Sequence, residues 1–297
     1  MKILVGNNKL QNPGGSETYA YALVAELVKR GHKVECVASG KDGIVSERIK
    51  RFDVPIHFGT IREQSYDLAL LSHTTSIALS QYVKAFKVQT CHGIYPVLEQ
   101  PVPGMDAYAA ISEEVAEHLR LKGHTSTIIH NGVDCTRFSP NGENEELLTV
   151  LSLAHGDTAN TIIREACAEL DFDLFVQNKY GDPIWDVESY IQQADLIISL
   201  GRGVYEAAAC GKNVIIFDSR SYTKQGAIGD GFVTDENFGK YLTHNCSGRY
   251  RKRQFKEDGL RSELKKYSPG MGKKLREFAV ENLNIEKQVD KYLALVR

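Results

Sequence analysis

The sequence lacks the features that mark several specialised classes of protein. It has no run of about 18 apolar residues, so no segment predicts a membrane-spanning helix. Its six cysteines are scattered without a Cys-x-x-Cys pair, which argues against a zinc ribbon or a disulfide scaffold and favours a reducing cytoplasm. Fixed-period repeats are absent too. The composition that remains, with 42% hydrophobic and 25% charged residues among 297, is typical of a globular protein, and we expect a cytoplasmic one.

Charge is balanced over the whole chain but not along it. Lysine and arginine number 36 against 38 acidic residues, for a net charge of −2. Residues 249–276, the basic segment, hold 11 of the cations and three acids, a local charge of +8. This segment is either a solvated basic face or a surface for phosphate-rich partners. Among such partners we expect peripheral contact with the inner face of an anionic membrane, and not nucleic acid.

Strands and helices alternate along the sequence. Residues 2–5 predict a strand, residues 17–30 an amphipathic helix and residues 33–38 a second strand. Gly31 suits the left-handed position that follows a helix, and Ser112 is placed to cap another helix further on. Alternation of this kind predicts an α/β fold with parallel sheets built from right-handed βαβ units.

One segment interrupts this alternation. Residues 131–146 are rich in turn and linker residues, including Asn131-Gly132 and Ser139-Pro140-Asn141-Gly142. We therefore predict two Rossmann-like αβα domains, residues 1–140 and 141–272, followed by a helical tail over residues 273–297.

The first candidate site is the segment Asn12-Pro13-Gly14-Gly15-Ser16-Glu17, between the first strand and the first helix. Ligands of open α/β sheets bind at the carboxyl ends of the strands. Gly14 and Gly15 would let a ligand approach the backbone, and a helix start attracts anions. The NAD fingerprint Gly-x-Gly-x-x-Gly is absent, which disfavours a nicotinamide cofactor. The alternative is that the two glycines only form a tight turn.

The second candidate is His92, in Thr90-Cys91-His92-Gly93 at the end of a predicted buried strand. A histidine there can hydrogen-bond a ligand hydroxyl or stabilise charge. Cys91 and His92 do not predict a protease pair, because neighbours on a strand point to opposite faces. A structural histidine is the alternative interpretation.

The third candidate follows a strand in the C-terminal half, where Gly201-Arg202-Gly203 leads into a helix rich in small residues. The helix start can hold a phosphate, and Arg202 adds positive charge. Glu206, in or near the first turn, can accept two ribose hydroxyls. The alternative is an acidic residue that the helix dipole stabilises.

Five motifs occur in the same order along both halves of the chain. They are Pro13-Gly14-Gly15-Ser16-Glu17, Glu26-Leu27-Val28-Lys29-Arg30-Gly31-His32, Ile111-Ser112-Glu113, Asn131-Gly132-Val133-Asp134 with Arg137-Phe138, and Glu206-Ala207-Ala208-Ala209-Cys210-Gly211. Together they resemble glycosyltransferase family 4, the last being similar to its EAxAxG donor motif. The resemblance implies the GT-B fold, in which two Rossmann-like domains face a cleft. It also implies a nucleotide-sugar donor in the C-terminal domain, an acceptor in the N-terminal domain, retention of anomeric configuration, no required metal and a final helix that packs back on the N-terminal domain.

By the same resemblance, Gly15 faces the donor phosphate or sugar, His92 contacts the sugar and Glu206 holds the ribose. Three features depart from the family pattern. Ile198 stands where the family has an acid, eight residues before Glu206, and the loop His155-Gly156-Asp157 lacks the usual cation pair. The chain is also short for the family. We expect Arg202, Lys179 and Arg164 to replace the missing cations.

The sequence thus predicts a retaining, metal-independent hexosyltransferase that moves a sugar from a nucleotide diphosphate, UDP in the first instance, to an acceptor hydroxyl. The predicted catalytic residues are His92 and Arg202. The predicted donor-binding residues are Gly14, Gly15, Gly201, Gly203, Glu206 and Lys179. By family analogy the acceptor is a glycan or a lipid-linked molecule, in surface glycan or glycolipid assembly. A GT-B nucleotide-sugar epimerase and a non-catalytic nucleotide-sugar binding protein are the alternatives.

Overall fold

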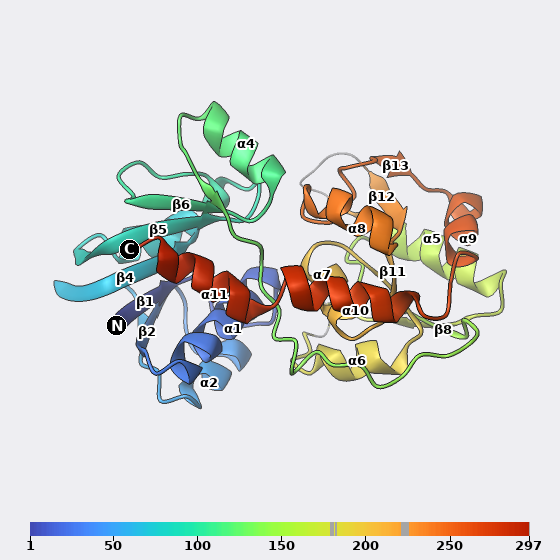
Figure 1. The fold of residues 1–297 in the computed structure, drawn as a ribbon, viewed down its shortest axis with the longest axis horizontal. Coiled ribbons are helices and arrows are strands. Elements are labelled where there is room, and N and C mark those ends of the chain that lie inside the picture. The colour runs from blue at the N-terminus through green and yellow to red at the C-terminus, as the bar shows by residue number, and fades with distance from the viewer. Residues whose placement is uncertain (179–180, 182, 221–225, 297) are drawn as a thin grey trace. The chain divides into compact units, whose positions relative to one another are not determined.

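The structure is a computed structural model that describes residues 1–178, 181, 183–220 and 226–296. It divides into two compact units (Figure 1). The first unit comprises Met1–Gly132 and Ile285–Arg297, and the second comprises Val133–Asn284. The chain therefore passes between the units twice, once after Gly132 and once after Asn284.

The first unit contains a seven-stranded sheet with the order β3-β2-β1-β4-β5-β6-β7, in which every neighbouring pair is parallel. Its strands are β1 (Lys2–Gly6), β2 (Lys33–Ala38), β3 (Ile56–Phe58), β4 (Gln64–Ser72), β5 (Val83–Cys91), β6 (Ala107–Ala110) and β7 (Thr127–Ile128). Its helices are α1 (Gly15–Lys29), α2 (Ile44–Lys50), α3 (His73–Leu79), α4 (Glu113–Leu121) and α11 (Ile285–Ala294), with a 3₁₀ turn η1 (Val97–Glu99).

Local sequence explains where the helices of this unit begin and end. Helix α1 begins at Gly15 and buries Leu23, Val24 and Leu27, the apolar stripe that the periodicity predicts. Gly31 follows it with a φ of +79°, a backbone conformation that glycine adopts without strain. The side chain of Ser112 accepts a hydrogen bond from the Val115 amide, so the predicted cap of α4 is confirmed.

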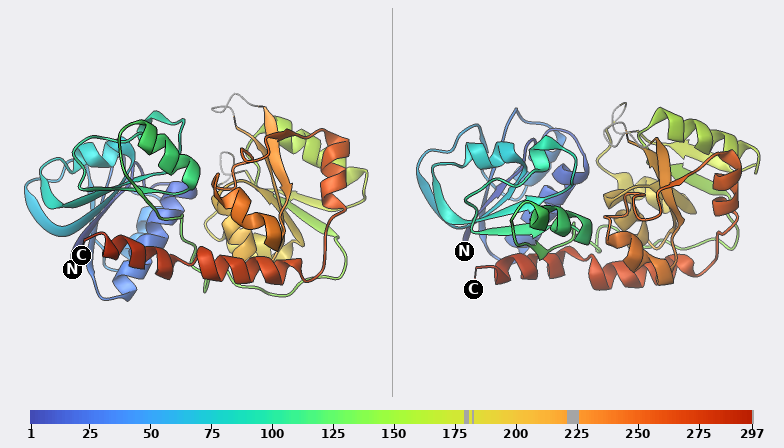
Figure 2. Two further views of the ribbon diagram at one scale, coloured as in Figure 1. Left: turned by 45° about the horizontal axis from the view of Figure 1, so that its top comes forward. Right: turned by 90° about the horizontal axis from the view of Figure 1, so that it is seen from above.

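The second unit contains a six-stranded sheet with the order β13-β12-β11-β10-β8-β9. Its strands are β8 (Thr149–Ser152), β9 (Asp173–Val176), β10 (Leu196–Ser199), β11 (Asn213–Ser219), β12 (Ala227–Phe232) and β13 (Arg253–Gln254). Its helices are α5 (Asp157–Ala168), α6 (Val187–Gln193), α7 (Arg202–Ala209), α8 (Asp235–Leu242), α9 (Glu257–Leu264) and α10 (Met271–Asn282). Helices lie on both faces of this sheet (Figure 2), with α5 and α9 packed on one face and α6, α7, α8 and α10 on the other.

The second sheet is parallel from β8 to β11, as predicted, and it ends in two antiparallel strands that the sequence did not predict. Strand β12 pairs antiparallel with β11, and β13 pairs antiparallel with β12. A side chain at Gly229 would meet the Ile216 carbonyl oxygen at 2.1 Å, so β12 needs a glycine to lie this close to β11.

The C-terminal tail is two helices and not one helical segment. Helix α10 belongs to the second unit, where the Arg276 guanidinium donates to the carbonyl oxygens of Cys135, Phe138 and Ala209. Helix α11 belongs to the first unit. The two helices are separated at Leu283 and Asn284.

The strand orders show where ligands are expected. In the first unit, strand order reverses between β1 and β4, and in the second unit it reverses between β8 and β10. In open α/β sheets, ligands bind beyond the carboxyl ends of the strands at such reversals. Ligands are therefore expected beside the loops that follow β1, β4, β8 and β10.

Within the ranges that the structure describes, none of the helices has the length and apolar character needed to cross a membrane.

Candidate functional site

The glycine loop of the first unit lies at the reversal between β1 and β4. Gly14 is the residue before α1 and Gly15 is its first residue. A side chain at Gly15 would meet no atom within 4 Å, so packing of the fold does not explain this glycine. At the end of β1, Asn7 is 1% exposed, and its side-chain oxygen has no hydrogen-bond partner within the described part of the chain. This edge of the sheet thus has both space and a buried acceptor.

His73 lies at the same reversal, directly after β4, and the sequence did not reveal it. It begins α3 with a φ of +73°, a left-handed conformation that is uncommon outside glycine. The Asn8 amide donates to its Nδ1 at 3.4 Å, which leaves the proton on Nε2, 4.0 Å from the Glu99 carboxylate. Burial lowers the pKa of His73 to about 4, so the ring is neutral near pH 7.

His92 follows β5 and is half-buried. Its Nε2 lies 3.0 Å from the Ser72 hydroxyl, and its ring stacks on His73 with centroids 5.7 Å apart. The ring of Tyr19, from α1, contacts it edge-on with centroids 5.3 Å apart. The two histidines and Ser72 therefore form a cluster at the carboxyl ends of adjacent strands.

In the second unit, α7 starts at the reversal between β8 and β10. Gly201 precedes it with a φ of +58°, and Arg202 is its first residue. A side chain at Gly203 would meet the Ser199 hydroxyl at 2.2 Å, so this glycine lets the helix start close to the end of β10.

Arg202 and Glu206, the two residues predicted to contact a nucleotide, contact each other. The Arg202 Nε lies 2.8 Å from the Glu206 carboxylate, one helical turn away, and the residues are 8% and 7% exposed. Burial raises the pKa of Glu206, while Arg202 and Arg137 favour its ionised form and oppose that rise. The pair places a buried cation at the positive end of a helix, where it gains nothing from the helix dipole.

The start of α5, on the other side of the same reversal, is already filled. The Asp218 carboxylate, at the end of β11, accepts hydrogen bonds from the backbone amides of His155, Gly156 and Ser219. It also pairs with Arg220 at 2.6 Å and is fully buried. An internal carboxylate thus takes the place that an anionic ligand would take at this helix start.

The other two cations predicted to contact the donor are Lys179 and Arg164. Lys179 lies outside the described residues. Arg164 is exposed and is the eighth residue of α5, so about 10 Å of helix separates it from the start. Arg137 makes a two-point ion pair with Glu188, at 2.9 and 2.7 Å. Ile198 is fully buried within β10, so the position counted back from Glu206 falls inside a strand.

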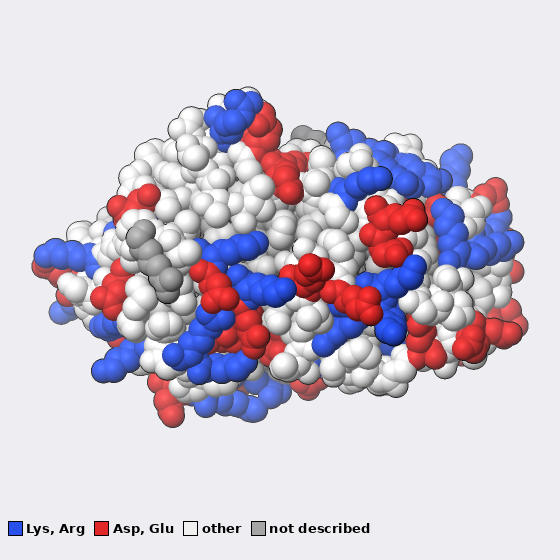
Figure 3. Space-filling model, viewed as in Figure 1, with Lys and Arg blue, Asp and Glu red and all other residues white. Residues whose placement is uncertain are grey.

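The basic segment is less uniform than its composition implies. Lysine and arginine side chains gather over β13 and α9 (Figure 3), but many have acidic partners. Arg253 and Lys266 both pair with Glu263, and Lys274 pairs with Asp235. Arg276 is bound to backbone carbonyls. The segment therefore presents fewer available cations than its local charge of +8 would indicate.

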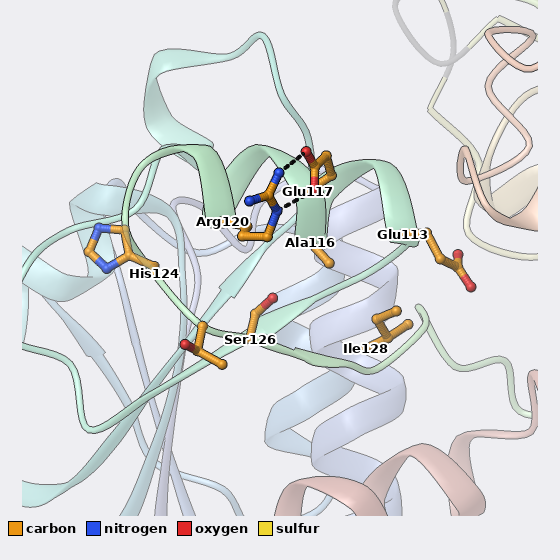
Figure 4. Close-up of a pocket in the computed structure, with 8 residues that line it drawn as sticks. Glu113, Ala116, Glu117, Arg120, His124, Ser126 and Ile128 are labelled. Atoms are coloured by element: carbon orange, nitrogen blue, oxygen red, sulfur yellow. Dashed lines mark hydrogen bonds and ion pairs between the residues drawn. The ribbon is translucent and has the colours of Figure 1, made fainter.

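A hollow of about 560 Å³ lies elsewhere in the first unit, between α4 and the edge strand β7 (Figure 4). Glu113, Glu117, Arg120 and His124 are among its lining residues, and Arg120 is bound at two points to Glu117. None of the predicted site residues that the structure describes lines it. Among the described residues, no group of three or more His, Cys, Asp or Glu side chains is arranged to hold a metal ion.

Comparisons with known proteins give a family match over part of the chain and a fold for the whole chain. Residues 13–137 match the model of Glycosyltransferase Family 4, and a comparison with curated proteins gives no match. A glycosyltransferase from Rickettsia africae ESF-5 is similar in structure, with 15% identity, a TM-score of 0.64 and 99% and 97% of the two chains covered.

Two further solved structures are similar over nearly the whole chain. An alpha-glucosyltransferase in complex with UDP and a 13-mer DNA has 10% identity, a TM-score of 0.64 and coverage of 100% and 99%. A Listeria monocytogenes protein proposed to be a UDP-N-acetylglucosamine 2-epimerase has 13% identity, a TM-score of 0.62 and coverage of 99% and 95%. The predicted fold, two Rossmann-like domains of the GT-B type, is confirmed.

Proposed function

We propose that the protein is a retaining glycosyltransferase, because residues 13–137 match the model of Glycosyltransferase Family 4 and the whole chain has the GT-B fold. It transfers a sugar from a nucleotide diphosphate, UDP in the first instance, to a hydroxyl group. The observation that carries this proposal is the start of α7, where a glycine-bounded helix start and a buried Arg202–Glu206 pair lie at a strand-order reversal.

In this proposal the second unit binds the nucleotide diphosphate. The diphosphate takes Arg202 as its cation at the start of α7, and the Glu206 carboxylate accepts the ribose hydroxyls. When the bond between the anomeric carbon and the diphosphate oxygen breaks, negative charge grows on that oxygen. The helix start and Arg202 stabilise this charge, which is electrostatic catalysis and requires no metal.

The first unit binds the sugar through Gly14, Gly15 and His92. Its edge is suited to hydroxyl groups, because His73 is neutral near pH 7 and the buried side-chain oxygen of Asn7 has no partner among the described residues. The acceptor oxygen forms the new bond to the anomeric carbon on the face that the diphosphate leaves, and the acceptor hydroxyl gives its proton to the departing diphosphate oxygen.

We assign the reaction to the cytoplasm and to assembly of a surface glycan or glycolipid, with a glycan or lipid-linked acceptor. The exposed cations of the basic segment, Lys252, Lys256, Lys265 and Lys273, provide the proposed contact with an anionic membrane. Co-sedimentation with anionic vesicles at low salt, lost at high salt, is the expected result. Absence of binding at low salt would contradict this contact.

The donor site is tested by calorimetry with UDP on the Glu206→Gln variant. Loss of the carboxylate should weaken UDP binding at least about tenfold, since a hydrogen bond to a charged group is worth roughly 1.5–3 kcal/mol. Deoxyribose analogues of UDP should lose less affinity than UDP does.

The matched control is Glu26→Gln in α1. Glu26 is also a buried helical carboxylate, paired with Arg30 four residues away at 2.6 Å, but it lies in the first unit. It should leave UDP binding unchanged. Equal UDP affinity in wild type and Glu206→Gln would place the donor site elsewhere.

Because the fold is also similar to that of a proposed epimerase, an experiment should distinguish sugar transfer from epimerisation. Incubation with UDP-sugars, with and without candidate acceptors, distinguishes the alternatives. A glycosyltransferase gives a product only with an acceptor, an epimerase interconverts the sugar without one, and a binding protein does neither.

A further inference from the structure

Helix α11 contributes one tyrosine to the core of the first unit. Tyr292, on α11, is fully buried, and its hydroxyl lies 2.8 Å from the hydroxyls of both Tyr19 and Thr90. Tyr19 donates to Tyr292, so the Tyr292 proton is left for Thr90. Burial raises the pKa of Tyr292 to about 12, which keeps this proton in place throughout the neutral range. Three elements, α1, β5 and α11, thus meet in one hydroxyl chain.

Both ends of this hydroxyl chain are connected to His92. The ring of Tyr19, at one end, contacts the His92 ring edge-on at 5.3 Å with an interplanar angle of 71°. Thr90, at the other end, precedes His92 by two residues at the carboxyl end of β5. Both Tyr19 and Thr90 are almost fully buried, so their hydroxyls depend on partners in the protein. Tyr292 therefore holds both the ring beside His92 and the strand end that carries it.

We propose that Tyr292 is a positioning residue for His92, so that α11 helps to set the catalytic geometry of the first unit. The proposal rests on the role assigned to His92 in the proposed function. The mechanism is indirect, because Tyr292 acts through Tyr19 and Thr90 and need not touch the substrate.

Helix α11 has other attachments, so the Tyr292 hydroxyl can be removed without undocking it. Glu286 pairs with Lys29 at 2.6 Å, and its carbonyl oxygen accepts from Arg30 at 2.7 Å. Gly132 is packed so closely that a side chain there would meet the Ile285 backbone at 2.7 Å. The Tyr292→Phe variant keeps the ring and these contacts and loses only the hydroxyl.

The experiment compares Tyr292→Phe with Tyr66→Phe. Tyr66 is also buried in the first unit, and its hydroxyl also has two side-chain partners, Glu35 and Gln64. It lies near the start of β4, about 20 Å along the strand from Ser72 and thus far from the His92 cluster. Both variants should lower the melting temperature by similar amounts. Only Tyr292→Phe should move the imidazole NMR signals of His92 and its titration midpoint.

Turnover provides the second measurement. Tyr292→Phe should lower kcat about tenfold while KM for the donor changes less than about twofold, because small displacements of a catalytic group act mainly on the chemical step. In a His92→Ala background the same substitution should cause no further loss, since two residues that act through one another are not additive.

These measurements separate the inference from the proposed function. Unchanged His92 signals in Tyr292→Phe, or an equal loss of kcat with and without His92, would overturn the positioning role. Shifted signals support it even where no transfer is found, and a normal kcat in His92→Ala would count against the role assigned to His92 in the proposed function instead.

Discussion

The carboxyl edges of the two sheets carry different kinds of side chain. The edge of the first unit has Asn7 and Ser72, which carry no charge, and His73, which burial keeps neutral near pH 7. His92 lies beside them, and the one carboxylate described next to His73 is that of Glu99, at 4.0 Å. The edge of the second unit has two ion pairs with buried carboxylates, Arg202–Glu206 and Arg220–Asp218.

This difference indicates which part of a ligand each edge can bind. Buried neutral donors and acceptors suit hydroxyl groups, because they hydrogen-bond without the desolvation penalty of a charge. Buried ion pairs carry a desolvation penalty, which is repaid where one partner can exchange its protein carboxylate for a ligand phosphate. A sugar fits the first edge and a diphosphate the second, which is the division of labour that we propose.

The largest effect on stability is expected at Asp218, at the carboxyl edge of the sheet in the second unit. Asp218→Ala leaves the amides of His155, Gly156 and Ser219 without their acceptor and the Arg220 charge without its partner. We expect the free energy of unfolding to fall by about 3–5 kcal/mol. Urea denaturation followed by circular dichroism measures this loss.

Asp157→Ala is the control for this change. Asp157 is exposed in the first turn of α5, the helix whose start the Asp218 carboxylate occupies. Its favourable interaction with the helix dipole should therefore be worth only about 0.3–1 kcal/mol. Similar losses in the two variants would mean that Asp218 is an ordinary helix-start acid and that the contrast between the edges is weaker than described.

The next largest effect is expected at His73, at the carboxyl edge of the sheet in the first unit, as a dependence of stability on pH. His73 has a pKa of about 4 in the folded protein against an ordinary value of 6.5, so between these values the unfolded chain binds the proton more readily. Lowering the pH through this window should therefore remove about 3 kcal/mol of stability through His73 alone.

Replacing His73 by asparagine isolates this contribution, because asparagine tolerates the left-handed backbone but does not titrate. Unfolding free energies of wild type and His73→Asn, measured from pH 7.5 to pH 4.5, should differ in slope by about 1.4 kcal/mol per pH unit below pH 6. Parallel curves would show that His73 binds its proton as readily in the folded protein as in the unfolded chain, so that burial does not keep this ring neutral.

The smallest effect should distinguish the two glycine loops. Gly203→Ala forces a side chain against Ser199 and should lower the free energy of unfolding by about 1–3 kcal/mol. Gly15→Ala meets nothing within 4 Å and should leave stability unchanged or raise it by about 0.4–1 kcal/mol. Transfer should nevertheless fall in Gly15→Ala, because the proposed sugar site is obstructed. Normal transfer would make Gly15 a turn residue only.

Local patterns predicted much of the fold. Helix α1 and the Ser112 cap of α4 follow from periodicity and capping, which act over a few residues. Strand β12 was not predicted, because its sequence Ala-Ile-Gly-Asp-Gly-Phe has glycine and aspartate at positions where strands usually have branched residues. Its pairing with β11 depends on the close approach at Gly229 and not on local preference.

The candidate site was predicted only in part, because strand order is not local. Gly14, Gly15, Arg202 and Glu206 were found from their position after strands, and their ligand roles stay predictions. The pairing of Arg202 with Glu206 was not expected, although their spacing of four residues on one helix indicates that it is possible. The stacking of His73 on His92 depends on β4 and β5 being neighbours, which no short-range pattern shows.

The two passages of the chain between the units have a consequence for the order of folding during synthesis. The second unit is continuous from Val133 to Asn284, so all of its strands can leave the ribosome in one stretch and associate. The first unit is interrupted. Tyr19 and Thr90 emerge early, but Tyr292 follows only after the whole second unit has been made. The first unit therefore matures last, although its synthesis begins first, and a translation arrest within α11 would leave its core without the final hydroxyl.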